Sequence, residues 1–286
     1  MEQIYVIMLL VLGVLAIIDL IVGVSNDAVN FLNSAIGSKA ISFKTTMIVA
    51  SLGVLVGALF SSGMMEIARS GIFVPSMFSF DDVMIIFLAV MISDILLLDV
   101  FNSLGLPTST TVSIIFELLG AAVCLALYKI YTSDETLDHL GMYINTKKAS
   151  TIVYSILLSV ILSFSLGSLI QYISRLIFTF HYEKKLKYFG AIFGGVAISA
   201  ITFFILIKGL KDVSFISKEQ SKWITTHQLL ILGGNFVFFL ALSQILISYF
   251  KVNILKVIIL IGTFALALAF AGNDLVNFIG VPIAAF

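Results

Sequence analysis

Two copies of a short polar motif interrupt an otherwise apolar chain, and they carry side chains that could bind ions. The motif reads SNDAVNF at 25–31 and GNDLVNF at 272–278, with five of the seven positions identical. Carboxylate and amide oxygens of this kind can coordinate a monovalent cation inside a transporter. The Asn residues alone could instead join helices by hydrogen bonds. An Asp in a membrane segment is costly, and it therefore indicates function.

A second group with binding chemistry is the uncharged sequence GLPTSTT at 105–111. Pro107 suits the first turn of a helix, because the N–H that it lacks would have no partner there. Ser109, Thr110 and Thr111 then lie at a helix N-terminus, where backbone N–H groups and the helix dipole can hold an oxyanion without Arg or Lys. The loop is too short and too apolar for an ordinary aqueous loop, which predicts a re-entrant hairpin with its tip at 107–111. The alternative is an ordinary helix that begins at Pro107 and is capped by threonine.

Six acidic residues lie in or beside apolar runs, and no basic residue lies in those runs except near their ends. Such acids must be protonated, exposed to water or bound to a cation. Coupling to Na⁺ or H⁺ would explain them. They are Asp19, Asp27, Asp94, Asp99, Glu117 and Asp274.

The elements that carry these groups are predicted to be membrane helices. The chain has 286 residues, of which 60% are hydrophobic and 11% charged, and its mean hydropathy is +1.15. This excludes a soluble domain. Apolar runs of about 20 residues are long enough to cross a bilayer as helices, and because they are apolar on all sides they exclude a barrel. Eight such runs are predicted, at 4–24, 45–65, 83–104, 108–128, 149–174, 188–207, 226–250 and 252–272.

Other functions are excluded by charge and cysteine content. The formal net charge is zero and no basic block is present, so no nucleic-acid partner is predicted. Cys124 is the sole cysteine, which excludes a disulfide framework and a thiolate metal site.

The two Asn-Asp motifs are predicted to belong to an inverted repeat. Counting the eight runs as crossings, the helices that carry the motifs enter the membrane from opposite faces, and binding is expected where they meet. Residues 4–38 would extend roughly 50 Å as one helix, more than the hydrocarbon thickness. We therefore expect the first helix to unwind at Gly23, Ser25 and Asn26.

These motifs resemble those of the PiT family of inorganic phosphate transporters. Residues 23–38 and 272–283 resemble two copies of its Gly-Ala-Asn-Asp-Val-Ala-Asn-Ala motif, and residues 105–113 resemble the first copy of its Gly-Leu-Pro-Val-Ser-Thr-Thr-His motif, with Val112 in place of the His. Asp94 and Asp99 have no counterpart in those motifs. The resemblance implies an all-α inverted-repeat secondary transporter with broken first helices and a re-entrant hairpin. It implies phosphate binding by Ser109, Thr110, Thr111, Asn26 and Asn273, and cation binding by Asp27, Asp274, Asn30 and Asn277, with Asp27 and Asp274 as Na⁺ ligands if sodium is the coupling ion.

The resulting prediction is Na⁺- or H⁺-coupled phosphate transport by an integral protein of the plasma (inner) membrane, with no other cofactor. Residues 1–128 would form the first repeat, 129–251 the connecting helices and 252–286 the start of the second repeat. No second Pro-Ser-Thr-Thr hairpin follows, so a longer chain or a second copy in a homo-oligomer is expected to complete the site. The alternatives are a symporter of another tetrahedral anion such as sulfate, an anion channel and an intramembrane aspartyl enzyme, although neither Asp27 nor Asp274 has the Gly-x-Gly-Asp context of such enzymes.

Overall fold

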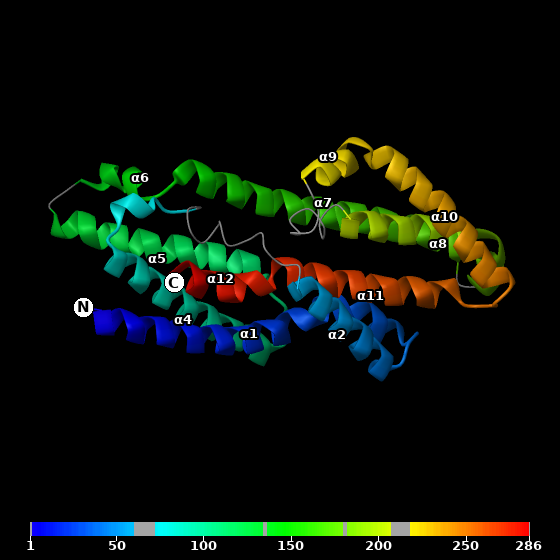
Figure 1. Cartoon of the computed structure of the whole chain (residues 1–286), viewed down its shortest axis with the longest axis horizontal. Coiled ribbons are helices and arrows are strands. Elements are labelled where there is room, and N and C mark those ends of the chain that lie inside the picture. Colours follow the sequence, from blue (N-terminus) through cyan, green and yellow to red (C-terminus); the bar gives the residue numbers. More distant parts are fainter. Residues whose placement is uncertain (1, 60–71, 134–135, 180–181, 207–217, 286) are drawn as a thin grey trace. The chain divides into compact units, whose positions relative to one another are not determined.

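The computed structural model describes residues 2–59, 72–133, 136–179, 182–206 and 218–285, and this part of the chain is helical apart from short connections (Figure 1). A single β-bridge within it joins Phe73 and Ile144. Its helices, in chain order, are α1 (Glu2–Ser38), α2 (Phe43–Leu59), η1 (Pro75–Met77), α4 (Phe80–Leu104), α5 (Thr110–Thr132), η2 (Leu137–His139), α6 (Leu140–Tyr143), α7 (Thr146–Phe178), α8 (Tyr182–Phe204), α9 (Lys218–Thr226), α10 (Gln228–Ser248), α11 (Ile254–Asn273) and α12 (Leu275–Ala285).

Within the described residues, seven helices are long and apolar enough to cross a membrane, namely α1, α4, α5, α7, α8, α10 and α11. They coincide with seven of the eight predicted runs, so the prediction of an all-α membrane protein is confirmed. The eighth run, 45–65, corresponds to the shorter α2 and then enters residues that lie outside the described part. The most apolar stretch of α7 has no buried residue. Such a surface is stable in lipid because the helix satisfies its own backbone hydrogen bonds.

The helix break predicted at the first motif is not observed. α1 is helical without interruption from Glu2 to Ser38, and the Ser25 hydroxyl donates to the Ile21 carbonyl at 2.7 Å inside the helix. Gly23 allows close packing instead, because a Cβ there would lie 2.2 Å from the Phe278 ring. The second copy differs: α11 ends at Asn273, α12 begins at Leu275, and Asp274 forms the turn between them.

The chain divides into two compact units. One unit comprises Met1–Asn30, Ser62–Leu158 and Asn273–Phe286, and the other comprises Phe31–Ser61 and Ser159–Gly272. These boundaries bring residues from the two ends of the sequence into the first unit. The predicted division at 128/129 and 251/252 follows sequence repeats rather than compactness, and it stays a prediction.

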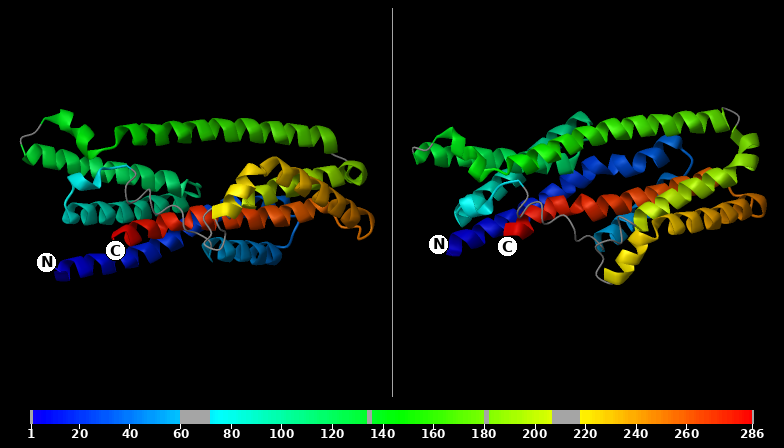
Figure 2. Two further views of the ribbon diagram at one scale, coloured as in Figure 1. Left: turned by 45° about the horizontal axis from the view of Figure 1, so that its top comes forward. Right: turned by 90° about the horizontal axis from the view of Figure 1, so that it is seen from above.

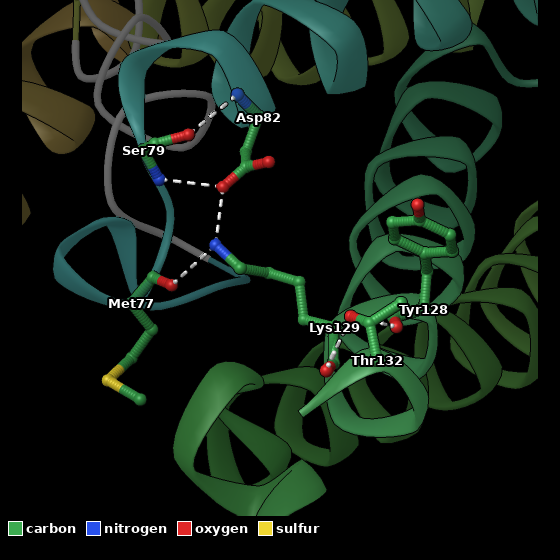
Figure 3. Close-up of polar contacts among 6 residues, drawn as sticks. All are labelled: Met77, Ser79, Asp82, Tyr128, Lys129 and Thr132. Atoms are coloured by element: carbon green, nitrogen blue, oxygen red, sulfur yellow. Dashed lines mark hydrogen bonds and ion pairs between the residues drawn. The ribbon is translucent and has the colours of Figure 1, made fainter. Parts of the chain in front are cut away.

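The centre of the first unit is the hairpin formed by α4 and α5, which run side by side (Figures 1 and 2). α4 ends in a Schellman turn: Gly105 has a φ of 66°, its N–H donates to Asn102, and the N–H of Leu106 donates to Phe101. At the opposite end, Lys129 of α5 forms an ion pair with Asp82 in the first turn of α4. Asp82 and Ser79 also form a reciprocal capping box (Figure 3). The ion pair therefore joins the two helices at the end away from the turn, and α4 is capped at both of its ends.

The core of the first unit is apolar and lies among these two helices and the parts of α1 and α12 that pack with them. α12 packs against both α4 and α5. The side chains that contribute most to this core include Leu12 from α1, Met84, Phe87 and Met91 from α4, Leu118 from α5 and Val281 from α12.

The second unit is packed through small residues. Gly53 and Gly57 of α2 lie against α11, where a Cβ at Gly57 would come within 2.3 Å of the Leu268 carbonyl oxygen. Gly194 of α8 lies against Ser243 of α10 in the same way, and a Cβ at Gly194 would come within 2.6 Å of the Ser243 Oγ. The α8 and α10 helices run side by side in Figure 2. Small residues spaced four apart allow membrane helices to approach closely, and van der Waals contact then holds them together.

Candidate functional site

The connection between α4 and α5 is held in place by the first Asn-Asp motif. Asn26 of α1 donates through its amide to Asn102 Oδ1 at 2.9 Å and to the Leu106 carbonyl at 3.1 Å. Its own Oδ1 accepts the Thr108 N–H at 2.8 Å. Asn102 in turn donates to the Val22 carbonyl at 2.9 Å. Both amide hydrogens of Asn26 are thus used by the chain, and Asn26 is 5% exposed, so its side chain positions the tip of the hairpin.

A polar pocket of about 350 Å³ lies beside this tip, within the first unit. Seven residues line it: Asp27, Asn30, Pro107, Thr108, Ser109, Thr110 and Asp274. About twelve waters would fill this volume at about 30 Å³ each, so a small anion fits with an ion or water beside it. Both Asn-Asp motifs and the Pro-Thr-Ser-Thr tip therefore contribute to one site.

The two motif carboxylates each accept a threonine hydroxyl from the start of α5. Asp27 Oδ2 accepts from Thr110 Oγ1 at 3.1 Å, and Asp274 Oδ1 accepts from Thr111 Oγ1 at 2.9 Å. Asp27 Oδ1 also accepts the Asn30 amide at 3.2 Å. Adjacent hydroxyls on one helical turn thus bond two acids that are 247 positions apart in the sequence, which holds the acids around the same helix N-terminus.

The N-terminus of α5 provides donors next to these acids. Ser109 is the N-cap, and its Oγ accepts the Val112 N–H at 3.4 Å. Ser109 is exposed, and its own hydroxyl hydrogen can point into the pocket that it lines. The first N–H groups of a helix have no intrahelical acceptor, and the dipole makes this end partially positive. The arrangement can bind an oxyanion.

Among the residues that the structure describes, the lining includes two carboxylates and no Lys, Arg or His. An anion that entered beside two ionised carboxylates would be repelled, since like charges at contact distances interact strongly in a partly buried site. The site can therefore bind an anion only when cations or protons neutralise Asp27 and Asp274.

The structure places most of the predicted binding residues in this pocket or next to it. Thr111 is bonded to Asp274 just beyond the lining residues, and Asn26 lies behind the tip. The side chains of Asn273 and Asn277 lie outside the described part. Sequence reasoning missed Asn102, although an Asn in an apolar helix just before the Gly-Leu-Pro turn is a signal that could have indicated it.

Comparison with known proteins identifies the family. The sequence profile described as the Phosphate transporter family matches residues 23–286. The chain belongs to this family. Its members are transporters rather than enzymes, so an intramembrane enzyme is not supported, and the chain is an integral membrane protein.

Several curated relatives are similar to this phosphate transporter family member. The protein of Pyrococcus abyssi named "Putative phosphate permease" is 28% identical over 272 residues, which cover 91% of this chain and 62% of the relative. Its counterpart of the same description in Helicobacter pylori is 26% identical over 270 residues, covering 91% of this chain and 48% of the relative. The chain spans less than two thirds of the length of these relatives.

A solved structure titled "The sodium-dependent phosphate transporter" has a similar fold. It matches with a TM-score of 0.67 and 20% identity over 97% of this chain and 67% of that chain. At this identity the likeness shows the fold, and it agrees with the helical membrane architecture described above.

Proposed function

We propose that the complete protein transports inorganic phosphate across the plasma membrane together with a cation, and that both bind in the pocket at the tip of the α4–α5 hairpin. One observation carries this proposal. Asp27 and Asp274 share a pocket with a hydroxyl-rich helix N-terminus, and no basic side chain of the described ranges lines that pocket. Its chemistry suits an anion only when positive charge accompanies that anion.

The hydrogen bonds of the pocket suggest how the two substrates are coupled. Thr110 and Thr111 donate their hydroxyl hydrogens to the carboxylates of Asp27 and Asp274. A cation bound by these carboxylates competes for the same oxygen lone pairs. The hydroxyls are then released to donate to the anion, and each substrate raises the affinity for the other because the linkage is reciprocal.

Coupling through Na⁺ suits the oxygen ligands present. Asp27 and Asp274 supply carboxylates, and the Asn30 side chain adds a carbonyl oxygen beside Asp27. Hard cations prefer such oxygen ligands. The sodium dependence named for the solved structure of the same fold agrees with this choice. Asn277 and Asn273 would complete the cation and anion sites from the second motif, as the resemblance implies.

Phosphate suits the pocket better than sulfate for a chemical reason. At neutral pH phosphate still carries at least one hydroxyl, which can donate to a carboxylate such as Asp27 or Asp274, whereas sulfate has no hydrogen to donate. A site that bonds a donor rejects an analogue without it, because its acceptors are left unpaired. The two acids therefore favour phosphate.

Tracer uptake by the complete protein in liposomes tests the proposal. We expect saturable phosphate uptake that rises with an inward Na⁺ gradient, compared with a matched choline gradient and with an imposed pH gradient. Uptake driven by the pH gradient alone would make H⁺ the coupling ion. Uptake that is indifferent to both gradients would refute coupling, competition by sulfate but not by phosphate would refute the substrate, and a current without saturation would indicate a channel.

A further inference from the structure

Three buried carboxyls form a second acidic cluster that the pocket does not include. Asp19 of α1 and Asp94 of α4 are both 0% exposed, and Glu117 of α5 is half-buried beside them. Asp19 interacts electrostatically with both of the other acids. Asp19 lies eight residues before Asp27 on α1, which is about 12 Å along the helix axis. The cluster is therefore a separate place within the first unit.

The hydrogen bonds of Ser113 require a proton on this cluster. Ser113 Oγ lies 2.5 Å from Asp94 Oδ1 and 2.9 Å from Glu117 Oε1. A serine hydroxyl has one hydrogen, so it can donate to only one of these two oxygens. The other contact is a hydrogen bond only if that carboxyl is protonated and donates to the hydroxyl. Two ionised carboxylates around one hydroxyl would leave one contact without a hydrogen.

Buried oxygen atoms without partners point to the same conclusion. Both carboxyl oxygens of Asp19, Asp94 Oδ2 and Glu117 Oε2 are buried, and none of them accepts a hydrogen bond from an amide, hydroxyl or basic group of the described residues. An ionised carboxylate in such surroundings is strongly disfavoured, and burial of this kind is resolved by neutralisation. Asp19 is thus a buried acid whose electrostatic partners are two other acids and no base.

Within the described ranges, no base on the neighbouring helices compensates the cluster. Lys129 lies twelve residues beyond Glu117 on α5 and is paired with Asp82. Asp27 is a further titratable group that interacts electrostatically with Asp94. α12 has no titratable side chain. The remaining titratable side chains on the packed elements lie on exposed faces or toward the helix ends, and they are Tyr5, Asp81, Asp99, Cys124, Tyr128, Tyr131, Asp138, His139 and Tyr143.

We infer that Asp19, Asp94, Ser113 and Glu117 form a proton-binding site, separate from the pocket, that holds at least one proton at neutral pH. No group of three or more His, Cys, Asp or Glu side chains among the described residues is arranged to hold a metal ion, so these acids do not form a metal site by themselves. The site lies between three helices of the first unit, and its charge acts on Asp27 through Asp94. A role for this proton in coupling rests on the proposed transport function, whereas proton binding itself does not.

Infrared spectroscopy of the purified complete protein tests the inference without requiring transport. The carbonyl stretch of a protonated carboxyl is separate from the bands of ionised carboxylate and of the amide backbone, and it shifts in heavy water. A D27N/D274N background removes the two pocket acids from the signal. In this background at about pH 7, a value far above the ordinary range of carboxyl groups, we expect the protonated band to be present.

Conservative variants then assign the band. D94N and E117Q are expected to remove or shift it, and D19N to shift it, because the amides replace the carboxyls with groups of similar shape. D99N is the matched control, since Asp99 lies on α4 but is exposed, and it should leave the band unchanged. S113A, which tests the hydroxyl bridge in a chain that keeps all three acids, should shift the band.

Two outcomes would overturn the inference. One is the absence of a protonated band in the D27N/D274N background, and a sodium-dependent shift of an ionised carboxylate band would then show a metal site. The other is a band that none of D19N, D94N, E117Q and S113A alters. Either result would leave the pocket and its phosphate uptake untouched, so failure of this inference is distinguishable from failure of the proposed transport.

Discussion

Replacement of Asn102 by alanine tests whether the tip of the α4–α5 hairpin must be held in place for phosphate to bind. Asn102 does not line the pocket, but its side chain accepts from Asn26 and donates to the Val22 carbonyl. N102A removes these two hydrogen bonds. At about 0.5–1.5 kcal/mol each, their net loss is about 1–3 kcal/mol.

This energy is expected to appear as weaker phosphate binding. If the two bonds stabilise the tip in its binding geometry, their loss lowers the occupancy of that geometry, and the apparent affinity falls by the same factor. The loss of about 1–3 kcal/mol corresponds to roughly a 5- to 150-fold rise in the half-saturating phosphate concentration. N26A is expected to be at least as severe, because Asn26 also bonds Leu106 and Thr108.

The assay is tracer phosphate uptake in liposomes at saturating Na⁺, with thermal unfolding measured on the same preparations. S103A is the matched control, since Ser103 is the exposed neighbour of Asn102 on α4. The double variant N26A/N102A should cost less than the sum of the single variants, because the two side chains share a hydrogen bond. Normal uptake by N102A together with impaired uptake by N26A would refute the reasoning and assign Asn26 to direct contact with phosphate.

Three further predictions concern the pocket and the packing of the second unit. D27N and D274N should each fold normally and lower Na⁺-driven uptake at least tenfold, about 1.4 kcal/mol in the affected step, and unchanged uptake by both would show that neither acid binds the cation. S109A should raise the half-saturating phosphate concentration by roughly ten- to a hundredfold, because a hydrogen bond to a charged ligand contributes about 1.5–3 kcal/mol; an unchanged value would place Ser109 outside the anion site. G57A should destabilise the protein by about 1–3 kcal/mol in thermal unfolding, because its Cβ would meet the backbone of α11 at 2.3 Å. G233A, whose Cβ meets nothing within 4 Å, is the control, and equal stability of the two variants would contradict the packing.

The membrane class and the main binding groups could be read from the sequence because they depend on local properties. Apolar runs of spanning length determine helices in a bilayer regardless of their neighbours. The repeated Asn-Asp motif and the Gly-Leu-Pro-Thr-Ser-Thr-Thr segment stand out because polar groups are rare in such runs. The structure places Asp27, Asp274 and Ser109 in one pocket, as these motifs suggested, although their roles in binding stay predictions.

Packing between segments that are distant in the sequence decided the roles of Gly23, Asn26 and the buried acids. Gly23 has no unwinding role in the described structure, because its missing Cβ makes room for Phe278, a contact that no local pattern reveals. The side-chain amide of Asn26 forms hydrogen bonds with the hairpin tip some 80 residues away in the sequence. Asn26 therefore positions the site. Asp19, Asp94 and Glu117 look like isolated acids in the sequence. Only the arrangement of three helices around Ser113 turns them into a cluster, because the energy of a buried charge depends on which groups surround it in space.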